Sequence, residues 1–386
     1  MIMQDPKITK EYVNDSILTS HKISKVDRAH GRLVVRGFEI SELTRNATFE
    51  EVAYLLWHGK LPAQTELDEF QEHISRERTL KPPIIDALRI VSKQSSGMNI
   101  LRMGAAALSI GYDYGYTRDL DVVEEQAARL LAQMSAVVAH SWRLSRGLEI
   151  VEPKAEHGFA EGFLYMLEGL EPSQARIDAL NAYLVTIAEH GVNASAFALR
   201  VIIATDSDMV SALTGAIGAI KGQRHGGAPF PVHAMLDAIG EQANAEKYIR
   251  DEVSAGRRIP GFGHSIYKVS DPRATVLAEA AERMAAVTGD RKLLDLTLFI
   301  ERTGVKLLDE LTPVGDHYAN VELYSALILR MVNVPPEIFT EVFATGRTAG
   351  WAAHMIDQLE EDRLIRPSST YIGGYGLTWK PVEERQ

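Results

Sequence analysis

Apolar residues recur at helical spacing along almost the whole chain, and this pattern limits the fold more than any other feature of the sequence. The stretch that follows Thr48 is representative. Thr48 and Glu51 have the spacing of a capping box, Val52 and Leu55 begin an apolar stripe, and Gly59 can end the helix in a left-handed conformation. The sequence therefore predicts an all-α fold with at most a small hairpin.

The same pattern predicts helices at about 64–77, 83–94, 99–113, 122–146, 158–168, 174–190, 207–221, 230–240, 272–287, 291–310, 319–333 and 337–360. Strand signals are confined to about 32–40 and to the tail near Tyr371. The helix from Ser211 to Ile220 carries glycines at 215 and 218, which would let another helix approach closely. That neighbour is either a helix of the same chain or one across a subunit interface.

Composition limits the class of protein. The 386 residues are 46% hydrophobic, which is enough for about two domains. The net charge of -11 argues against a continuous nucleic-acid or anionic membrane surface, although a local basic pocket remains possible. The absence of cysteine excludes disulfides and thiolate chemistry. Because we find no secretory signal and no membrane span in the sequence, we expect a cytoplasmic protein.

Two short segments concentrate histidine, arginine and glycine in a way that helix packing does not require. The segment 221–227 places His225 before two glycines, directly after the small-residue helix. The segment 259–273 contains paired glycines, His264 and an arginine at the start of a predicted helix, where an anion would be favoured. Taken singly, the first also fits an exposed loop histidine, and the second a glycine turn with Asp271 as a helix cap.

A third segment, 319–325, places Glu322 near the beginning of a mostly apolar helix. Alone, this acid is a common feature of a helix N-terminus. The sequence contains no motif for a serine nucleophile elbow, a phosphate-binding loop, a dinucleotide fold or a zinc protease. Acid and base chemistry is therefore the expectation, and a metal site built from the twelve histidines is poorly supported.

In combination, the segments resemble the citrate synthase family. The resemblance rests on five ordered motifs: Ala-Glu-His-Gly-Val-Asn-Ala-Ser at 188–195, His-Gly-Gly at 225–227, Pro-Gly-Phe-Gly-His at 260–264 with Asp-Pro-Arg at 271–273, Asn-Val-Glu at 320–322, and Gly-Arg-Thr-Ala-Gly-Trp-Ala-Ala-His at 346–354 followed by Arg-Pro at 366–367. It extends from about residue 27 to about residue 373. The short bacterial type often called the second citrate synthase is similar to this chain in having Asn-Val-Glu.

The resemblance implies that the protein condenses acetyl-CoA with oxaloacetate and hydrolyses citryl-CoA. It assigns the catalytic roles to three residues. Glu322 would remove a proton from the thioester methyl group, and His225 would donate a hydrogen bond to the developing enolate oxygen. His264 would act at the ketone of oxaloacetate. Acetyl-CoA enters as a co-substrate, and neither a resident cofactor nor a metal is implied.

The resemblance also assigns substrate contacts. Oxaloacetate has two carboxylates, which suit bidentate guanidinium groups. The corresponding residues are His190, Arg273, Arg347 and Arg366, the last reaching in from the neighbouring subunit. The residues expected to contact CoA are Arg257, Arg258, Pro260, Gly261, Gly263 and Lys268.

The family architecture implies an all-α homodimer in which a small domain is inserted in a large one. The large domain corresponds to residues 1–226 and 335–386, and the small domain to 227–334. His190 and His225 would belong to the large domain, while Arg273 and Glu322 would belong to the small one. The catalytic set is then complete only when the domains close, which also excludes water.

The sequence departs from the family pattern at three places. Glu322 stands where most members have Asp, Gln223-Arg224 replaces Pro-Leu before His225, and Gly315-Asp316-His317 replaces a basic residue. Two alternatives therefore stay open. One is a 2-methylcitrate synthase that uses propionyl-CoA with the same residues, and the other is a helical dimer that binds CoA or a dicarboxylate without turnover.

Overall fold

The computed structural model describes residues 21–222, 225, 229–263, 267, 269–312 and 317–385. Within these ranges the chain forms sixteen α-helices and one small sheet, so the prediction of an all-α fold is confirmed. None of the helices described is both long enough and apolar enough to cross a membrane.

The helices follow one another along the chain as α1 (Ile40–Asn46), α2 (Phe49–His58), α3 (Gln64–Glu77), α4 (Pro82–Gln94), α5 (Met98–Ala107), α6 (Leu120–Ser145), α7 (Phe159–Glu168), α8 (Gln174–Ile187), α9 (Ala194–Ile203), α10 (Met209–Ile220), α11 (Phe230–Ile239), α12 (Gln242–Ser254), α13 (Pro272–Thr288), α14 (Lys292–Leu311), α15 (Val321–Met331) and α16 (Phe339–Glu361). Short 3₁₀ turns, η2 (Pro336–Ile338) and η3 (Val382–Glu384), precede α16 and lie near the C-terminus.

Helix α2 shows how local sequence sets the boundaries. The Thr48 hydroxyl accepts a hydrogen bond from the backbone N–H of Glu51, and the Glu51 carboxylate accepts one from the backbone N–H of Thr48 at 2.6 Å. Gly59 ends the helix with φ of 75°. Both features are those that the sequence predicts, because a capping box satisfies amide groups that the first helical turn leaves unpaired.

The sheet contains β1 (Ser24–Asp27), β2 (Arg32–Val35) and β3 (Phe38–Glu39), paired antiparallel in that order. Arg36 and Gly37, both with positive φ, make the turn between β2 and β3. The strands at about 32–40 were expected, whereas β1 was not. The prediction of a strand near Tyr371 is wrong. Residues 363–381 form no strand, because the exposed tail pairs with no other backbone segment among the described residues.

Three helices go beyond the sequence prediction. Helix α1 is a short helix that directly follows the hairpin, and α9 begins at the Asn193 cap, whose side chain accepts from two backbone N–H groups. Helix α12 is mostly polar, so the helical spacing of apolar residues is weak in its sequence. Ion pairs at i,i+4, such as Lys247–Asp251 and Arg250–Glu246, stabilise it. Helix α5 is shorter than predicted and ends before Gly111, which has positive φ.

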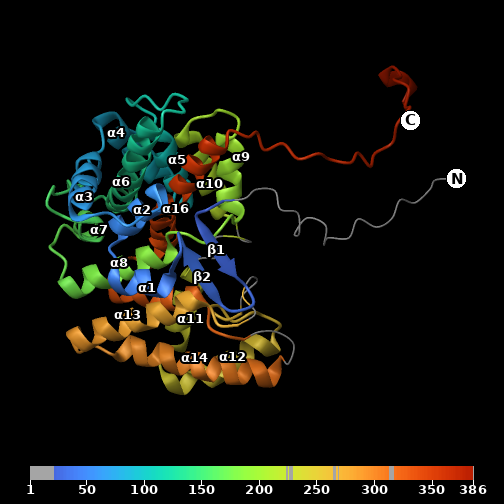
Figure 1. Cartoon of the computed structure of the whole chain (residues 1–386). Helices are drawn as coiled ribbons and strands as arrows, with labels where there is room; N and C mark the ends of the chain where they lie inside the picture. Colours follow the sequence, from blue (N-terminus) through green and yellow to red (C-terminus); the bar gives the residue numbers. More distant parts are fainter. Residues whose placement is uncertain are drawn as a thin grey trace.

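Helix α16 runs through the centre of the molecule, where it packs against α2, α6, α8, α9 and α10 (Figure 1). Most of its residues are buried. Helices α11–α14, gold to orange in Figure 1, gather at the opposite end from α4 and α5. His190, which follows α8, contacts Tyr267, which precedes α13, so these two segments meet.

The small residues of α10 are explained in part by packing within the chain. A Cβ atom at Gly215 would lie 2.2 Å from Cδ1 of Ile202, so α9 approaches α10 closely at this point. A Cβ atom at Gly218 would meet nothing within 4 Å. Intrachain packing therefore accounts for the first glycine and leaves the second without a neighbour among the described residues.

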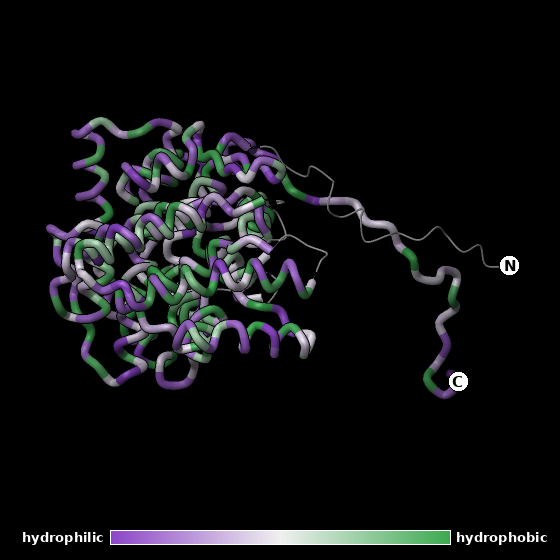
Figure 2. The backbone as a smooth tube through the Cα atoms, turned by 90° about the horizontal axis from the view of Figure 1, so that it is seen from below, coloured by the Kyte–Doolittle hydropathy of each residue, from purple (hydrophilic) through white to green (hydrophobic). Residues whose placement is uncertain are grey.

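The C-terminal tail leaves the helical body after α16. Figures 1 and 2 show it running away from the body as an extended segment. It carries the apolar side chains of Leu364, Tyr371, Ile372, Leu377 and Trp379, all of them mostly exposed. This tail also contains Arg366.

Candidate active site

His225 is held by the beginning of α9. Its Nε2 accepts a hydrogen bond from the backbone N–H of Ser195 at 3.2 Å and lies 2.8 Å from the Ser195 hydroxyl. Trp351 in α16 donates to the same hydroxyl at 3.1 Å. Because a backbone N–H can only donate, Nε2 acts as the acceptor and the neutral ring carries its proton on Nδ1.

The charge state of His225 agrees with this tautomer. Burial and the nearby Arg347 guanidinium lower its pKa to about 4. The imidazole is therefore neutral near pH 7, with Nδ1–H as a hydrogen-bond donor. Arg224, which immediately precedes His225 in the sequence, lies outside the described residues.

Arg347 is buried in the middle of α16. Its Nε donates to the backbone oxygen of Ile187 at 2.5 Å, which fixes the plane of the guanidinium. The two terminal nitrogens have no hydrogen-bond partner among the described residues. Burial, opposed by Glu189 and assisted by Arg273, lowers its pKa to about 10. At neutral pH the group is still a cation, with a planar pair of donors available to a carboxylate.

Arg273 lies in the first turn of α13 and is held by the residue that caps this helix. Asp271 accepts from the backbone N–H of Arg273, and its carboxylate pairs with the Arg273 side chain at 2.8 Å. Asp271 also accepts from the backbone N–H of Val321, which begins α15. Burial opposes the charge of Arg273, but Asp271 outweighs it and the pKa is raised. The predicted cap and the predicted anion-binding arginine are thus parts of one cluster.

His190 lies between α8 and α9, and its Nε2 is 3.0 Å from the hydroxyl of Tyr267. Both side chains are buried. Arg273 and Asp271 are close enough to Tyr267 to influence its pKa, which burial raises. Tyr267 therefore connects His190 to the cluster at the start of α13.

Glu322 lies in the first turn of α15, one helix away from Arg273. Asn320 caps the helix by accepting from the backbone N–H of Glu322 at 2.9 Å. Burial raises the pKa of the Glu322 carboxyl, Arg273 opposes that shift, and Asp271 adds to it. A carboxylate that is partly withdrawn from water is a stronger base than an exposed one, as proton abstraction requires.

The loop predicted to contact CoA is fastened to the segment that precedes Glu322. Gly263 N–H donates to the oxygen of Tyr318, Asn320 N–H donates to the oxygen of Gly261, and the Asn320 amide donates to the oxygen of Gly263, each at 2.9 Å. Gly261 and Gly263 have positive φ. This loop and Glu322 are therefore held together as one unit, with Pro260 at its start.

The remaining predicted residues are not all brought to this cluster. Arg257 is exposed and paired with Glu252 at 2.7 Å, and Arg258 is exposed. Arg366 is exposed in the tail that follows α16, a segment that runs away from the helical body (Figure 1). His264 and Lys268 lie outside the described residues, so the structure places neither.

One group of described residues has the spacing of metal ligands: His157, Glu161 and Glu171. It lies apart from the cluster above. Lys154 already forms an ion pair with Glu171, which is half-exposed. A cation from the chain itself therefore occupies the position where a metal would compete.

Comparisons with known proteins identify the family. The family model described as "Citrate synthase, C-terminal domain" matches residues 13–368. The chain belongs to the citrate synthase family. Citrate synthase 2 of Bacillus subtilis is 39% identical over 350 residues, which cover 90% of this chain and 92% of the relative. The resemblance to a second citrate synthase is thereby confirmed.

Two further relatives bear on the fold and the substrates. The 2-methylcitrate synthase 2 of Corynebacterium glutamicum is 33% identical, with 94% of each chain covered. The citrate synthase of Thermoplasma acidophilum, solved as a ternary complex with carboxymethyl coenzyme A and oxaloacetate, aligns with a TM-score of 0.85 at 29% identity. The alignment covers 97% of this chain and 98% of that structure. The chain is thus an acyltransferase of the citrate synthase family, with the helical fold of a solved member.

The structure of this chain adds residues that the sequence analysis did not single out. Ser195 and Trp351 orient His225, Tyr267 contacts His190, and Glu189 lies near Arg347. Glu189, Ser195 and Trp351 lie inside motifs that carry the family resemblance, and this was the sequence signal that could have identified them. Their roles depend on contacts between segments far apart in the chain.

Proposed function

We propose that the chain condenses acetyl-CoA with oxaloacetate and hydrolyses citryl-CoA to citrate and CoA. The observation that carries the proposal is the grouping of two buried arginines, a neutral histidine and a carboxylate with a raised pKa. Arg273 lies close enough to Arg347 and Glu322 to influence the pKa of each. Arg347 in turn lies close enough to His225 to lower its pKa. Two neighbouring cations suit a substrate with two carboxylates.

The first step forms the nucleophile. The Glu322 carboxylate takes a proton from the methyl carbon of acetyl-CoA, and the electron pair moves toward the thioester oxygen. The Nδ1–H of His225 donates a hydrogen bond to that oxygen. Because Ser195 and Trp351 fix the ring before the reaction, little reorganisation is needed as the charge develops.

The second step joins the two substrates. The enol carbon attacks the ketone carbon of oxaloacetate, and the new alkoxide takes a proton from His264, as the family resemblance assigns. Arg273 and Arg347, together with His190, hold the carboxylates of oxaloacetate. Water then attacks the thioester of citryl-CoA, releasing citrate and the CoA thiol, so the cycle needs neither a metal nor a redox cofactor.

The domain division at about 227 and 334 and the homodimer belong to the same proposal. The uncovered Gly218 on α10 and the apolar side chains of the exposed tail support a second copy as their partner. Arg366 on this tail would then complete the oxaloacetate site of the neighbouring subunit. CoA would lie along Pro260, Gly261 and Gly263, with phosphates near Arg257, Arg258 and Lys268. The cytoplasmic location stays a prediction.

A second candidate is the use of propionyl-CoA in place of acetyl-CoA. The relative from Corynebacterium glutamicum, a 2-methylcitrate synthase, supports keeping this candidate. The two substrates differ by one methylene group, which is worth only about 1–3 kcal/mol in a pocket. The same residues would perform both reactions.

The test is free thiol release from acetyl-CoA and from propionyl-CoA, each with and without oxaloacetate. We expect oxaloacetate-dependent release with acetyl-CoA, at a higher kcat/KM than with propionyl-CoA. A reversed ratio would favour the 2-methylcitrate synthase. No release from either thioester, in a sample that still binds oxaloacetate, would favour a binding protein without turnover.

A further inference from the structure

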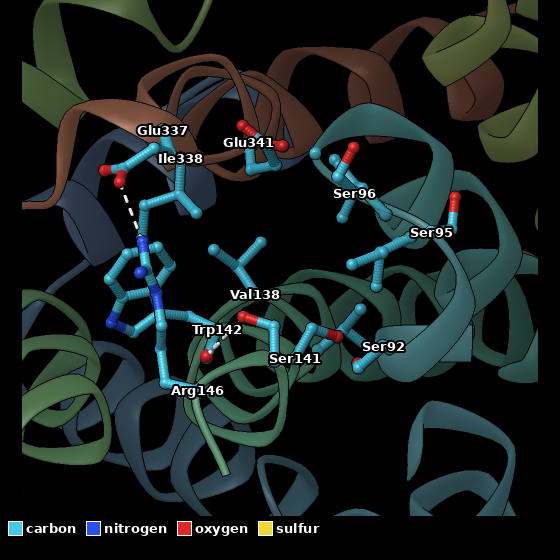
Figure 3. A pocket seen from close by; sticks show the side chains of 15 residues that line it. Ser92, Ser95, Ser96, Val138, Ser141, Trp142, Arg146, Glu337, Ile338 and Glu341 are labelled. Atoms are coloured by element: carbon cyan, nitrogen blue, oxygen red, sulfur yellow. Dashed lines mark hydrogen bonds and ion pairs between the residues drawn. The ribbon is translucent and has the colours of Figure 1, made fainter. Parts of the chain in front are cut away.

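A separate cavity lies between α4, α5, α6 and the start of α16, and it shares no lining residue with the substrate site (Figure 3). Its volume is about 300 Å³, at the lower end of the range for small-molecule sites. We call it the second cavity. Its polar lining consists of Ser92, Ser95, Ser96, Ser141, Ser145 and Glu341, with Arg146 and Glu337.

Three of these side chains are buried without a hydrogen-bond partner. Glu341 Oε1, Ser92 Oγ and Ser141 Oγ contact neither solvent nor any polar partner among the described residues. Only 5% of the Glu341 surface is exposed. Buried polar groups in folded proteins are nearly always hydrogen-bonded, since leaving one unpaired costs about 1–3 kcal/mol. Among the three residues, Glu341 is the ionisable one, so the lining of the cavity includes a carboxyl group with an unpaired oxygen.

The backbone beside Glu341 leaves space for its carboxylate. Gly97 precedes α5 with φ of 53°, a conformation that favours glycine. A Cβ atom added there would lie 3.2 Å from Glu341 Oε1. The loop at the mouth of the cavity is therefore shaped so that the carboxylate has room on this side.

Charge decides the class of occupant. Arg146 and Glu337, both about half-exposed, pair with each other at 2.7 Å, as the dashed line in Figure 3 shows. The Arg146 guanidinium also lies over the Trp142 ring. Glu341 is the only other ionisable side chain of the described lining, and the one cation there, Arg146, is paired with Glu337 and not with Glu341. Burial raises the pKa of Glu341 to about 7.

The rest of the lining is apolar. Ile100, Leu101, Val137, Val138 and Ile338 face the space around the carboxylate and the hydroxyl groups. We propose that the second cavity binds a small amphipathic amine, whose ammonium group pairs with the Glu341 carboxylate while its apolar part contacts these walls. An anion would be repelled by Glu341, and the cationic group at the rim is already paired.

Binding of three matched probes tests the class of ligand: phenethylamine, the neutral 2-phenylethanol and the anionic 3-phenylpropanoate. Isothermal titration calorimetry on the full-length protein at pH 7.5 gives each dissociation constant. A charge-assisted hydrogen bond contributes about 1.5–3 kcal/mol, so we expect the amine to bind roughly tenfold or more tightly than the alcohol. The propanoate should bind most weakly.

Two variants locate the site. Glu341→Gln keeps the size of the side chain but removes its charge, so it should remove the preference for the amine over the alcohol. Val138→Phe should fill the cavity and weaken both ligands. Exposed Glu152→Gln serves as the matched control and should leave both dissociation constants unchanged. Saturating oxaloacetate should not compete with phenethylamine, because the lining residues are distinct from Arg273 and Arg347.

The outcomes separate the proposal from its alternatives. An amine that binds no more tightly than the alcohol would show that Glu341 stays protonated and that the cavity takes neutral ligands. Amine binding unchanged in Glu341→Gln would place the ligand elsewhere. No binding of any probe at millimolar concentration would show a cavity that holds only water. Each of these three results overturns the proposal and leaves the proposed synthase activity untouched.

Discussion

Glu189 in the substrate site and Glu341 in the second cavity are both buried carboxyl groups, with 1% and 5% of their surfaces exposed. Glu189 pairs with His354 at 3.1 Å and accepts hydrogen bonds from Ser24 and from the backbone of Gly191. Burial opposes its ionisation, but His354 and Arg347 outweigh burial and lower its pKa. Partners, and not burial alone, decide which of the two is charged.

The substrate site and the second cavity therefore differ in electrostatic sign. In the substrate site the carboxylates are matched by Arg273, Arg347 and His354, and Arg347 keeps free donors for an anion. In the second cavity the carboxyl group at position 341 is matched by nothing in the described lining. The first arrangement suits an anionic ligand and the second a cationic one.

The largest expected effect is on stability. Glu189→Ala leaves buried partners uncompensated, so we expect it to lower the free energy of unfolding by about 3–5 kcal/mol. Urea unfolding at pH 7 measures the change. Exposed Glu152→Ala is the control and should change stability by less than about 0.5 kcal/mol. A loss below about 1 kcal/mol for Glu189→Ala would show that its partners do not depend on its charge.

The second prediction is that removing the charge of Glu341 raises the free energy of unfolding. The pKa of Glu341 is about 7 in the folded state, above the 4.5 that is usual for an exposed glutamate, so ionisation costs stability as the pH rises through this interval. Glu341→Gln should be more stable than the wild type by about 3 kcal/mol near pH 8, and by about 1 kcal/mol near pH 5. Urea unfolding at both pH values measures the gap. A gap that does not change with pH would mean that Glu341 has a partner in solution.

The smallest effect concerns the geometry of the cation in the substrate site. Arg347→Lys keeps the charge but loses the planar pair of donors, so oxaloacetate should bind about tenfold more weakly. Calorimetric titration with oxaloacetate gives the dissociation constant. Arg45→Lys, in an exposed ion pair with Glu279, is the control. Equal affinity of Arg347→Lys and the wild type would exclude bidentate recognition at this position.

Local patterns predicted the features that depend on neighbouring residues. The capping box of α2, the cap at Asp271 and most helix ranges follow from spacing along the chain, and the structure has them. Helix α12 was missed because its stability comes from surface ion pairs. The prediction of a strand near Tyr371 was wrong because an apolar, β-favouring sequence forms a strand only where a partner strand is present.

The site was predictable to the extent that motifs carried it. His225, Arg273, Arg347 and Glu322 were named from the sequence, and the structure brings them together. The tautomer of His225 depends on Ser195, thirty residues away, and no local pattern indicates that contact. The unpaired state of Glu341 was likewise hidden, because a helical period marks a residue as buried but does not show what surrounds it.

The most direct test of the proposed chemistry is the rate of citrate formation by Glu322→Gln, measured together with its affinity for oxaloacetate. A general base contributes roughly 10²–10⁴-fold, so we expect the rate to fall at least a hundredfold. Oxaloacetate affinity should stay within about twofold, because Arg273 and Arg347 remain. Glu322→Asp, which keeps a carboxylate at this position, should retain more activity than Glu322→Gln. Nearly full activity of Glu322→Gln would contradict the account and require another base.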